Sequence, residues 1–439
     1  MTEPTLGNAD HTSVKSRNPP QLHAVNAIRV IAEYFVVRHH ILPTRLQKGD
    51  YNEQAHGPIG VDIMSFFFVL SGFVLMYSFE RTDFSTWQSK REFISGRVTK
   101  LYPIFLLNWM FSVPKRIIDP EPAEQTCWTY HLCPVLQLVM LDSWFGCGYN
   151  FTLNGISWFL SCLFWMWFVF PFIKDHLITY VFRDSYIWPK LVLMNIVWGL
   201  AFVLLWDYDI YTVAPFPLLR FGEFLIGCGA ALAPESWVIT GKRYWIPFTV
   251  VIILYNLERT EHGMFWLCLR EDAAHSDCSL WRAGQKQFDD VRTPCITVLE
   301  KIVNKYAVVW ACLIHGIARD ELSFLTASAD PTNPSARRHW TMRVLHTDVF
   351  KFLSKFSPTL YLSHLSMYYA VIFLGQHFMG WEKNKWRDDT LLFVVYVACY
   401  SLQNALIWVL DRLSQLYSHQ PTRKGGEDHE PLVVNDTRA

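Results

Sequence analysis

The feature that most restricts the fold of this chain is a series of long apolar stretches that continues along most of its length. Most of them are roughly 17–23 residues long, the length that an α-helix needs to cross about 30 Å of hydrocarbon. Apolar residues make up 51% of the chain and charged residues only 18%, below the roughly 25% typical of soluble domains. We therefore expect an all-α, polytopic membrane protein of about ten transmembrane helices.

Length and low charge place the expected spans near residues 24–42, 58–79, 97–113, 155–173, 188–206, 217–233, 244–258, 306–325, 357–379 and 390–413. The stretch 135–145 is apolar but too short to cross a bilayer, so we expect it to be interfacial or re-entrant. The polar segments 1–22 and 417–439 are expected to be disordered cytoplasmic tails on either side of a transmembrane domain at 23–416.

Lys and Arg residues indicate the orientation, because they gather in the short cytoplasmic loops of membrane proteins. With both termini in the cytoplasm, the basic clusters within 81–100, 242–243, 337–355 and 423–424 all fall on one face. Lys115 and Arg116 are an exception, since this topology places them outside. The prediction is a multi-pass integral membrane protein, although the sequence does not identify the membrane. The balance of 39 basic and 39 acidic residues gives no support to nucleic acid as a partner.

The cysteines follow the same topology. Six lie in the two large loops expected on the outer face, namely Cys127, Cys133, Cys147, Cys268, Cys278 and Cys295, and four lie within spans. The outer face suits disulfides, so we expect at least one, although the pairing is open and several of the six as free thiols is the alternative. The chain has no CxxC pair, so we expect no metal site. Asn150 begins an N-glycosylation pattern on the outer face, a triplet that also arises by chance.

The first span carries a row of ionisable side chains, Arg29, Glu33 and His40, and such residues inside a membrane are costly and usually functional. Their spacing of four and seven residues puts all three on one face of a helix. Arg29 then lies near the cytoplasmic end and His40 near the outer end, roughly 16 Å apart along the axis. The alternative is that Arg29 snorkels to the headgroups and pairs with Glu33, while His39 and His40 are interfacial.

Asp62 enters the second span from the outer side, where the first span ends with His40. The two side chains can therefore meet at one depth in the membrane. A carboxylate that orients an imidazole and supports its protonated form is what a general-base histidine needs. In the alternative interpretation, Asp62 is a carboxylate at a helix N-terminus that interacts with the positive end of the helix dipole.

Several short motifs follow one another along the chain. Arg29 and His40, with ten residues between them, precede Gly60-Val61-Asp62 and the segment FVLSGF at 68–73. The later motifs are RVTKLYP at 97–103, SWFLS at 157–161, RFGEFLIG at 220–227 and SPTLYLSH at 357–364. This ordered set, over roughly residues 23–413, resembles the acyltransferase-3 family of integral membrane acyltransferases.

The resemblance implies a transferase that moves an acyl group from cytoplasmic acyl-CoA to an acceptor hydroxyl, often on the far side of the membrane. The acyl group is expected to be acetyl, which makes the reaction an O-acetylation, and the acceptor is expected to be a carbohydrate or a lipid. In the family the histidine of the first span, here His40, is held to be the key catalytic residue, and the matching arginine is Arg29. The partners implied are the lipid bilayer, acyl-CoA as donor and a hydroxyl-bearing acceptor.

Two positions depart from the family pattern. The family often has Glu two residues after the SWFLS segment, where this chain has Leu163. The second arginine of the third-span motif is Lys100, which keeps the charge but not the bidentate fork for phosphate. The change at Leu163 leaves three interpretations open: an altered acceptor, replacement of the carboxylate by Glu33 or Asp62, or loss of activity.

Acyl transfer from a thioester suggests a role for each residue. His40 is the candidate general base. Arg97 and Lys100, at the cytoplasmic mouth of the third span, are candidate anchors for the CoA phosphates, or else ordinary positive-inside anchors. Arg29 is a candidate for holding the pantetheine or its thioester, with the polar row along a channel between the two faces. We expect His364, in the ninth span, to be a packed and hydrogen-bonded histidine.

The rival class of function is non-enzymatic. A transporter, or a catalytically inactive family member, could keep the same scaffold, because charged rows also line ion pathways. A transporter has no use for a CoA-phosphate anchor or for CoA release, so donor chemistry separates the two classes. Arg220 and Glu223, three residues apart in the sixth span, are expected to pair with each other as a structural contact.

Overall fold

The computed structural model describes residues 19–41, 59–113, 128–145, 147, 153–183, 185–205, 215–236, 243–250, 306–328, 340–378 and parts of 393–412. Within these ranges all regular secondary structure is helical, so the all-α prediction is confirmed. Residues 1–18 of the predicted tail at 1–22 lie outside the described residues, as does the predicted tail at 417–439. The acceptor pattern at Asn150 and the cysteines Cys127, Cys268, Cys278 and Cys295 lie outside them too.

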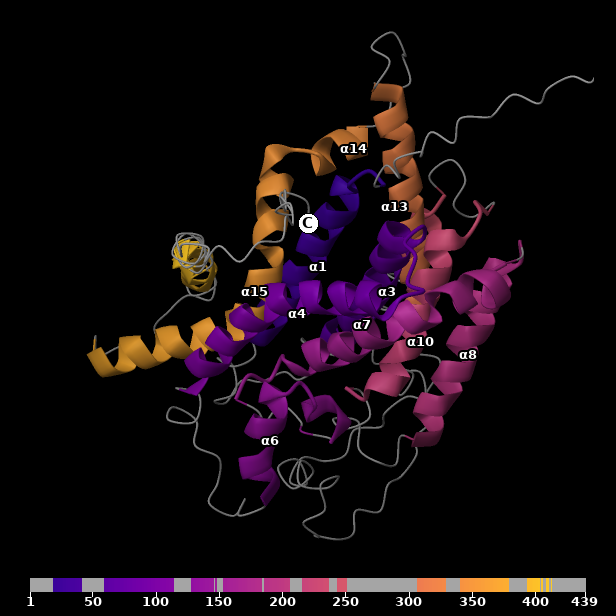
Figure 1. Ribbon diagram of the computed structural model, residues 1–439. Helices are drawn as coiled ribbons and strands as arrows, with labels where there is room; N and C mark the ends of the chain where they lie inside the picture. Colours follow the sequence, from indigo (N-terminus) through magenta and orange to yellow (C-terminus); the bar gives the residue numbers. More distant parts are fainter. Residues whose placement is uncertain are drawn as a thin grey trace, which may run out of the picture.

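The labelled helices are α1 (His23–Ile41), α3 (Ile59–Phe79), α4 (Trp87–Phe111), α6 (Trp128–Leu138), α7 (Trp158–His176), α8 (Ile187–Leu205), α10 (Pro217–Leu232), α13 (Ala307–Ser328), α14 (Trp340–Leu345) and α15 (Asp348–Phe378) (Figure 1). A 3-10 turn, η2 (Asp142–Trp144), precedes α7, and a π-helical turn, η3 (Leu177–Val181), continues it. Two helices begin earlier than the predicted spans, α4 at Trp87 rather than 97 and α15 at Asp348 rather than 357. Hydropathy identifies only the apolar part of a helix, so it misses the polar helical turns that precede that part. In α4 these polar turns begin after the N-cap residue Thr86.

One helix in the described part of the chain, Trp158–Val181, is long and apolar enough to cross a membrane by itself. Shorter apolar helices cover Ile63–Phe79, Ile187–Ala201 and Phe393–Leu402. The charged residues of α1 lower its mean hydropathy, and the basic first half of α4 does the same there. The number of ten spans therefore stays a prediction.

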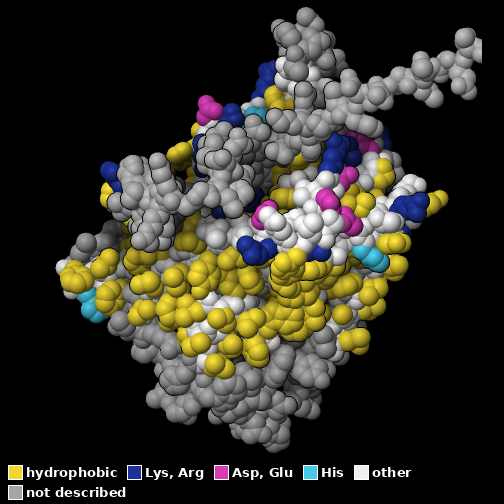
Figure 2. Space-filling model, viewed as in Figure 1, with side chains coloured by type: hydrophobic (Ala, Val, Ile, Leu, Met, Phe, Trp, Pro, Cys, Tyr) yellow, Lys and Arg dark blue, Asp and Glu magenta, His cyan; other side chains and the backbone are white. Residues whose placement is uncertain are grey.

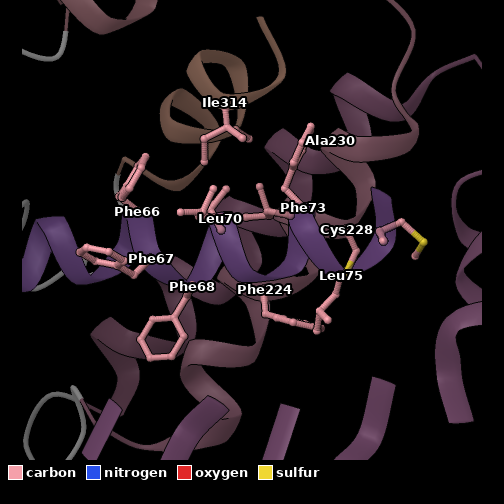
Figure 3. Close-up of a cluster of buried hydrophobic side chains, with 14 of the residues drawn as sticks. Phe66, Phe67, Phe68, Leu70, Phe73, Leu75, Phe224, Cys228, Ala230 and Ile314 are labelled. Atoms are coloured by element: carbon pink, nitrogen blue, oxygen red, sulfur yellow. The ribbon is translucent and has the colours of Figure 1, made fainter. Parts of the chain in front are cut away.

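Helix α3 lies at the centre of the core and packs most closely against α10. Its apolar side chains meet those of α10 and α13 in one cluster that includes Phe66, Phe67, Phe68, Leu70, Phe73, Leu75, Phe224, Cys228, Ala230 and Ile314 (Figure 3). A Cβ atom at Gly72 of α3 would overlap the carbonyl of Phe224. In the same way, a Cβ atom at Gly227 of α10 would overlap the carbonyl of Val69. The glycines of the FVLSGF and RFGEFLIG motifs are therefore required for the close approach of two helix backbones.

The two ends of the molecule differ in the elements they carry. Helix α6, from a loop predicted to be outside, and helix α14, from a loop predicted to be cytoplasmic, lie at opposite ends (Figure 1). In the same view, Figure 2 shows a broad band of exposed hydrophobic side chains across the middle, with Lys, Arg, Asp and Glu side chains gathered on the α14 side of it. Part of this apolar surface is the exposed face of α8, with Val192, Leu193, Ile196, Val197, Leu200 and Leu204.

The segment 135–145 is not one continuous span. Helix α6 ends at Leu138, and Met140 follows in the left-handed region with φ of 55°. There the amide of Leu141 donates to the carbonyl of Leu136 at 2.9 Å, a pattern typical of helix C-termini. Cys133 and Cys147 form a disulfide across this turn, so the prediction of at least one disulfide among the six loop cysteines is confirmed. Cys162, Cys228, Cys312 and Cys399 are buried free thiols within helices.

Candidate functional site

The polar row of α1 begins at Arg29, which bonds to the neighbouring helix α15. Its Nη2 donates to the carbonyl oxygen of Ser354 at 3.0 Å. Pro358 lies inside α15, and because proline has no N–H, the carbonyl four residues earlier lacks its usual helical donor. Arg29 supplies that donor from another helix. Arg29 Nε is buried and has no hydrogen-bond partner among the described residues.

Glu33 lies in the middle of the row and is only 1% exposed. It sits beside Ser357 and Tyr361 of α15, and neither carboxylate oxygen has a hydrogen-bond partner within the described ranges. A cavity of about 300 Å³ adjoins it, lined by Val30, Ile31, Tyr34, Phe35, Leu353, Phe356, Leu360 and Tyr396. This depth supports the interpretation that the row does more than anchor the helix, because a buried carboxylate does not reach the headgroups.

His40 ends the row, and its ring lies against the ring of His364 of α15. The ring centroids are 5.3 Å apart and the rings are inclined by 30°. His364 is fully buried, with Nδ1 3.2 Å from the carbonyl oxygen of Leu360. The prediction of a packed, hydrogen-bonded His364 is confirmed, but sequence reasoning did not place it against His40. The sequence signal that could have predicted this contact is a parallel pairing of the two helices. Residue 29 of α1 lies against residue 354 of α15, and residue 40 lies against residue 364.

The whole polar row therefore faces α15, as the prediction of a shared helix face requires. Helix α3, which carries Asp62, also packs against α1. The side chain of Asp62 lies outside the described residues, and so does that of His39. The pairing of Asp62 with His40 accordingly stays a prediction.

The two predicted anchors for CoA lie on α4, which packs against α15 and α7. The guanidinium carbon of Arg97 lies over the rings of Phe93 and Phe79, at 3.9 and 4.7 Å from their centroids. Cation–π contacts of this kind hold a cation in a fixed place. Lys100, one turn further along, is exposed. Arg97 is thus a packed residue as well as a candidate phosphate ligand, and phosphate binding by both residues stays a prediction.

Sequence reasoning missed a buried polar cluster beside the SWFLS motif. The hydroxyl of Ser157 donates to Asp142 Oδ2 at 3.2 Å, and Asn154 Nδ2 donates to the carbonyl of Leu362 on α15 at 3.2 Å. Asp142 is 1% exposed, and burial raises the pKa of its carboxyl to about 6, although the hydrogen bond from Ser157 acts the other way. The available signal was a carboxylate inside an apolar stretch followed by a serine at the start of a span.

Arg220 and Glu223 pair as predicted. Arg220 Nη1 lies 2.9 and 3.1 Å from the two carboxylate oxygens, and both side chains are fully buried. The guanidinium carbon also lies 5.4 Å from the ring centroid of Phe68 and 5.5 Å from that of Trp158. Residues of three motifs, FVLSGF, SWFLS and RFGEFLIG, thus meet at one ion pair, which gives these motifs a structural reason to occur together.

Leu163 occupies the position where the family often has glutamate. It is 7% exposed and belongs to the main apolar core, so it supplies no carboxylate. The buried carboxylates among the described residues are Glu33, Asp142, Glu223 and Glu321, of which Glu223 is paired with Arg220.

A second polar cluster, also missed from sequence, lies where α1 begins. Glu321 of α13 is fully buried, and its Oε1 accepts a hydrogen bond from the amide of Ala24 at 2.9 Å. The same oxygen lies 2.7 Å from His346 Nε2. The ring of His23 meets the ring of His346 edge to face, with 5.4 Å between centroids. This cluster fixes the first turn of α1 to the α13–α14 end of the molecule.

Comparison with known proteins agrees with the motif pattern. A family model described as an acyltransferase domain matches residues 22–410, a range that begins just before α1 and includes every motif and every site residue named above. Comparison with curated proteins found no match, and neither did comparison with solved structures. Because the family model covers nearly the whole chain, the chain belongs to the acyltransferase-3 family.

Proposed function

We propose that the protein is an integral membrane acyltransferase that transfers an acyl group, acetyl in the first instance, from acyl-CoA to a hydroxyl group of a carbohydrate or lipid. The observation that carries this proposal is the contact of the polar row of α1 with α15. It brings together the Arg29–His40 motif and the SPTLYLSH motif of an acyltransferase family. Burying such a row of ionisable groups costs stability, so its presence inside the fold favours a functional role.

A location in a membrane, with about ten spans, is part of the proposal. The exposed apolar band in Figure 2 supports it, because a surface of this kind is matched by hydrocarbon rather than by water. The face of α8 is typical, with Leu193 61% and Leu204 77% exposed. The charges gathered toward the α14 end agree with a cytoplasmic face on that side. Acyl-CoA would then reach the site from the α14 end and the acceptor from the α6 end.

The chemical step uses His40 as general base. His40 takes the proton of the acceptor hydroxyl, the hydroxyl oxygen bonds to the thioester carbon, and the carbon–sulfur bond breaks to release CoA. The proton passes to the CoA sulfur, which leaves His40 neutral for the next cycle. A positioned base contributes about 10²–10⁴-fold. Asp62 is proposed to orient His40, while Arg29 and Glu33 place the donor along the row.

Donor binding is assigned to α4. Arg97 and Lys100 are proposed to hold the CoA phosphates, because cationic side chains form strong charge-assisted bonds with phosphate. The Phe79 and Phe93 rings fix the Arg97 guanidinium before the donor binds, which reduces the entropy lost on binding.

One observation favours a second candidate function, a catalytically inactive family member or a transporter. Leu163 replaces a family carboxylate and is packed in the core, so its region of the site has lost one charge. If that carboxylate is required for transfer and neither Glu33 nor Asp62 replaces it, the scaffold would bind ligands without transferring an acyl group.

Purification in detergent followed by a thiol-release assay tests the proposal. Acyl-CoAs of increasing chain length are supplied with and without carbohydrate and lipid acceptors, and free CoA is measured. We expect acceptor-dependent release of CoA by the parent protein and none by His40→Ala. No release from the parent with any donor–acceptor pair would favour the inactive member or transporter.

A further inference from the structure

His364 carries a nitrogen that the fold leaves open next to the proposed base. Its Nδ1 is 3.2 Å from the carbonyl oxygen of Leu360, and a carbonyl only accepts, so Nδ1 holds the proton of the neutral ring. Nε2 is then a bare acceptor. It is buried and has no hydrogen-bond partner among the described residues. A buried acceptor left unpaired lowers the stability of the fold, so this nitrogen calls for an explanation.

A second histidine shows that burial alone does not explain it. His315 of α13 is also buried, with Nδ1 2.6 Å from the carbonyl oxygen of Ala230 and with Nε2 unpartnered within the described ranges. Its ring neighbour is Trp188, met edge to face at 5.5 Å. Trp188 does not titrate, whereas the ring neighbour of His364 is His40. His315 and His364 therefore make the same hydrogen bond and have the same unpartnered nitrogen among the described residues. They differ in the neighbouring ring, which can take up a proton beside His364 but not beside His315.

We propose that His364 is a positioning residue for His40: its bare Nε2 accepts a hydrogen bond from His40 once His40 has taken the proton of the acceptor hydroxyl. The proton then sits on His40, one N–H points to His364, and the other delivers the proton to the CoA sulfur as the carbon–sulfur bond breaks. The rings are 5.3 Å apart between centroids and inclined by 30°, which brings the edge of each ring close to the other. This inference rests on the proposed function and adds a residue to its site.

Other titratable groups near His40 and His364 also influence how readily the two rings bind a proton. Glu33 lies two turns back on α1, and Tyr361 of α15 has its ring centroid 6.1 Å from that of His364. Tyr396 and Cys399, on the helix that begins at 393, lie near Glu33. Asp62 enters from α3, with its side chain outside the described residues. His364 differs from these groups in its ring contact with His40 and in an open acceptor nitrogen.

Three variants separate the possible roles of His364. His364→Asn keeps an amide donor for the Leu360 carbonyl but removes the ring and the open nitrogen. His364→Phe keeps a stacking ring without either nitrogen. His315→Asn is the matched control, since it makes the same change at a buried histidine that does not touch His40. Monodispersity and melting temperature in detergent establish that each variant is folded.

The first measurement is acyl transfer as a function of pH. We expect both His364 variants to lower kcat by at least about tenfold, with KM for acyl-CoA within about twofold of the parent. The acid limb of the kcat/KM profile should move to lower pH, because loss of an acceptor for protonated His40 weakens proton binding there. His315→Asn should match the parent. A His364→Asn enzyme with parental kcat and pH profile would overturn the inference, and a fully active His364→Phe would assign the effect to stacking alone.

A second measurement does not need transfer activity. Reaction of His40 with diethyl pyrocarbonate, followed by mass spectrometry across pH, reports how readily His40 binds a proton. The midpoint should move to lower pH in both His364 variants and stay unchanged in His315→Asn, with His40→Ala as the assignment control. An unchanged midpoint in both variants would refute the inference even in a catalytically active parent. A shifted midpoint in a parent that releases no CoA would support it and refute the proposed function alone.

Discussion

The two ends of α1 lie beside histidines that have different neighbours. At the α14 end, His346 Nε2 lies 2.7 Å from Glu321, and the same carboxylate accepts a hydrogen bond from the first turn of α1. At the other end, His40 stacks on His364, whose Nε2 has no hydrogen-bond partner among the described residues. One helix thus begins at a carboxylate that lies against both its first turn and a histidine, and it ends beside a histidine nitrogen that no described group approaches as a hydrogen-bond partner.

The difference separates structural roles from chemical ones. Paired buried groups hold helices together, because breaking the pair leaves a costly unsatisfied partner. A buried group without a partner lowers the stability of the folded state, and where it lies beside a proposed catalytic residue it is a candidate for a chemical role. The comparison therefore predicts that substitutions at the two ends affect different quantities, stability at one end and acyl transfer at the other.

The largest effect is expected at His40. His40→Ala should lower acyl transfer by about 10²–10⁴-fold, equivalent to about 3–5 kcal/mol of barrier, while the protein still inserts and binds acyl-CoA. The measurement is CoA release with purified protein at saturating donor. His39→Ala is the control, since residue 39 is rotated by about 100° on an α-helix. Equal losses in the two variants would show that the face of α1 does not determine the function.

Glu321 tests the opposite end. Glu321→Ala removes the acceptor of the Ala24 amide and the partner of His346, so the free energy of unfolding should fall by about 1–3 kcal/mol. Thermal unfolding in detergent measures the loss, and transfer per folded molecule should stay near the parental value. Asp348→Ala is the control, because its pair with Lys351 is exposed and such pairs contribute little. A Glu321→Ala protein with parental stability but no activity would contradict the structural role that is assigned to Glu321.

A substitution of Asp142 tests whether the buried carboxyl group near α6 lowers the stability of the fold when it is ionised. Burial raises the pKa of its carboxyl from 3.8 to about 6, so the folded state favours the protonated form. The stability that this group contributes is therefore full below about pH 4 and is lost as pH rises to about 6. Asp142→Asn should remove this slope and, above about pH 6, raise the free energy of unfolding by about 1–2 kcal/mol.

Melting temperatures of both proteins between pH 4 and 8 give the comparison for Asp142. Parallel curves would mean that Asp142 is ionised in the folded state over the whole range and is paired by a group outside the described residues.

Donor binding should be affected from α4 rather than from either end of α1. Arg97→Ala and Lys100→Ala should each raise KM for acyl-CoA by about three- to tenfold at low salt, and by less at high salt, where phosphate contacts are screened. Arg97→Lys separates charge from the planar fork. Arg91→Ala, an exposed arginine of the same helix, is the control. Parental KM values in both alanine variants would leave these residues with an anchoring role only.

The smallest effect is expected at the contact between Arg29 of α1 and the helical turn that precedes Pro358 in α15. Pro358→Ala returns an N–H to the Ser354 carbonyl, so the stabilising contact of Arg29 becomes redundant. Loss of Arg29 should then destabilise the protein by about 1 kcal/mol less than in the parent, as measured by a double-mutant cycle of unfolding free energies. Strict additivity would show that Arg29 does not replace the missing donor. Transfer activity lost with Arg29 in both backgrounds would add a direct role toward the donor.

Much of the fold followed from patterns that act within one helix. Apolar stretches located the helices, and the spacing of Arg29, Glu33 and His40 placed them on one face, because both depend on local geometry. Arg220 and Glu223 paired as three-residue spacing indicates. The starts of α4 and α15 were placed too late, since a search for apolar segments does not register polar helical turns.

The tertiary structure alone decided which helices those faces meet. Ala24 and Glu321 are separated by 297 residues, and Arg29 and Ser354 by 325. No periodicity relates positions that far apart, because the register between two helices depends on how all their side chains pack together. The sequence by itself therefore determined an acyltransferase-3 chain with a charged first helix. Packing of α1 against α15 decided that His40 would lie on His364, because only an assembled core brings the two rings to one depth.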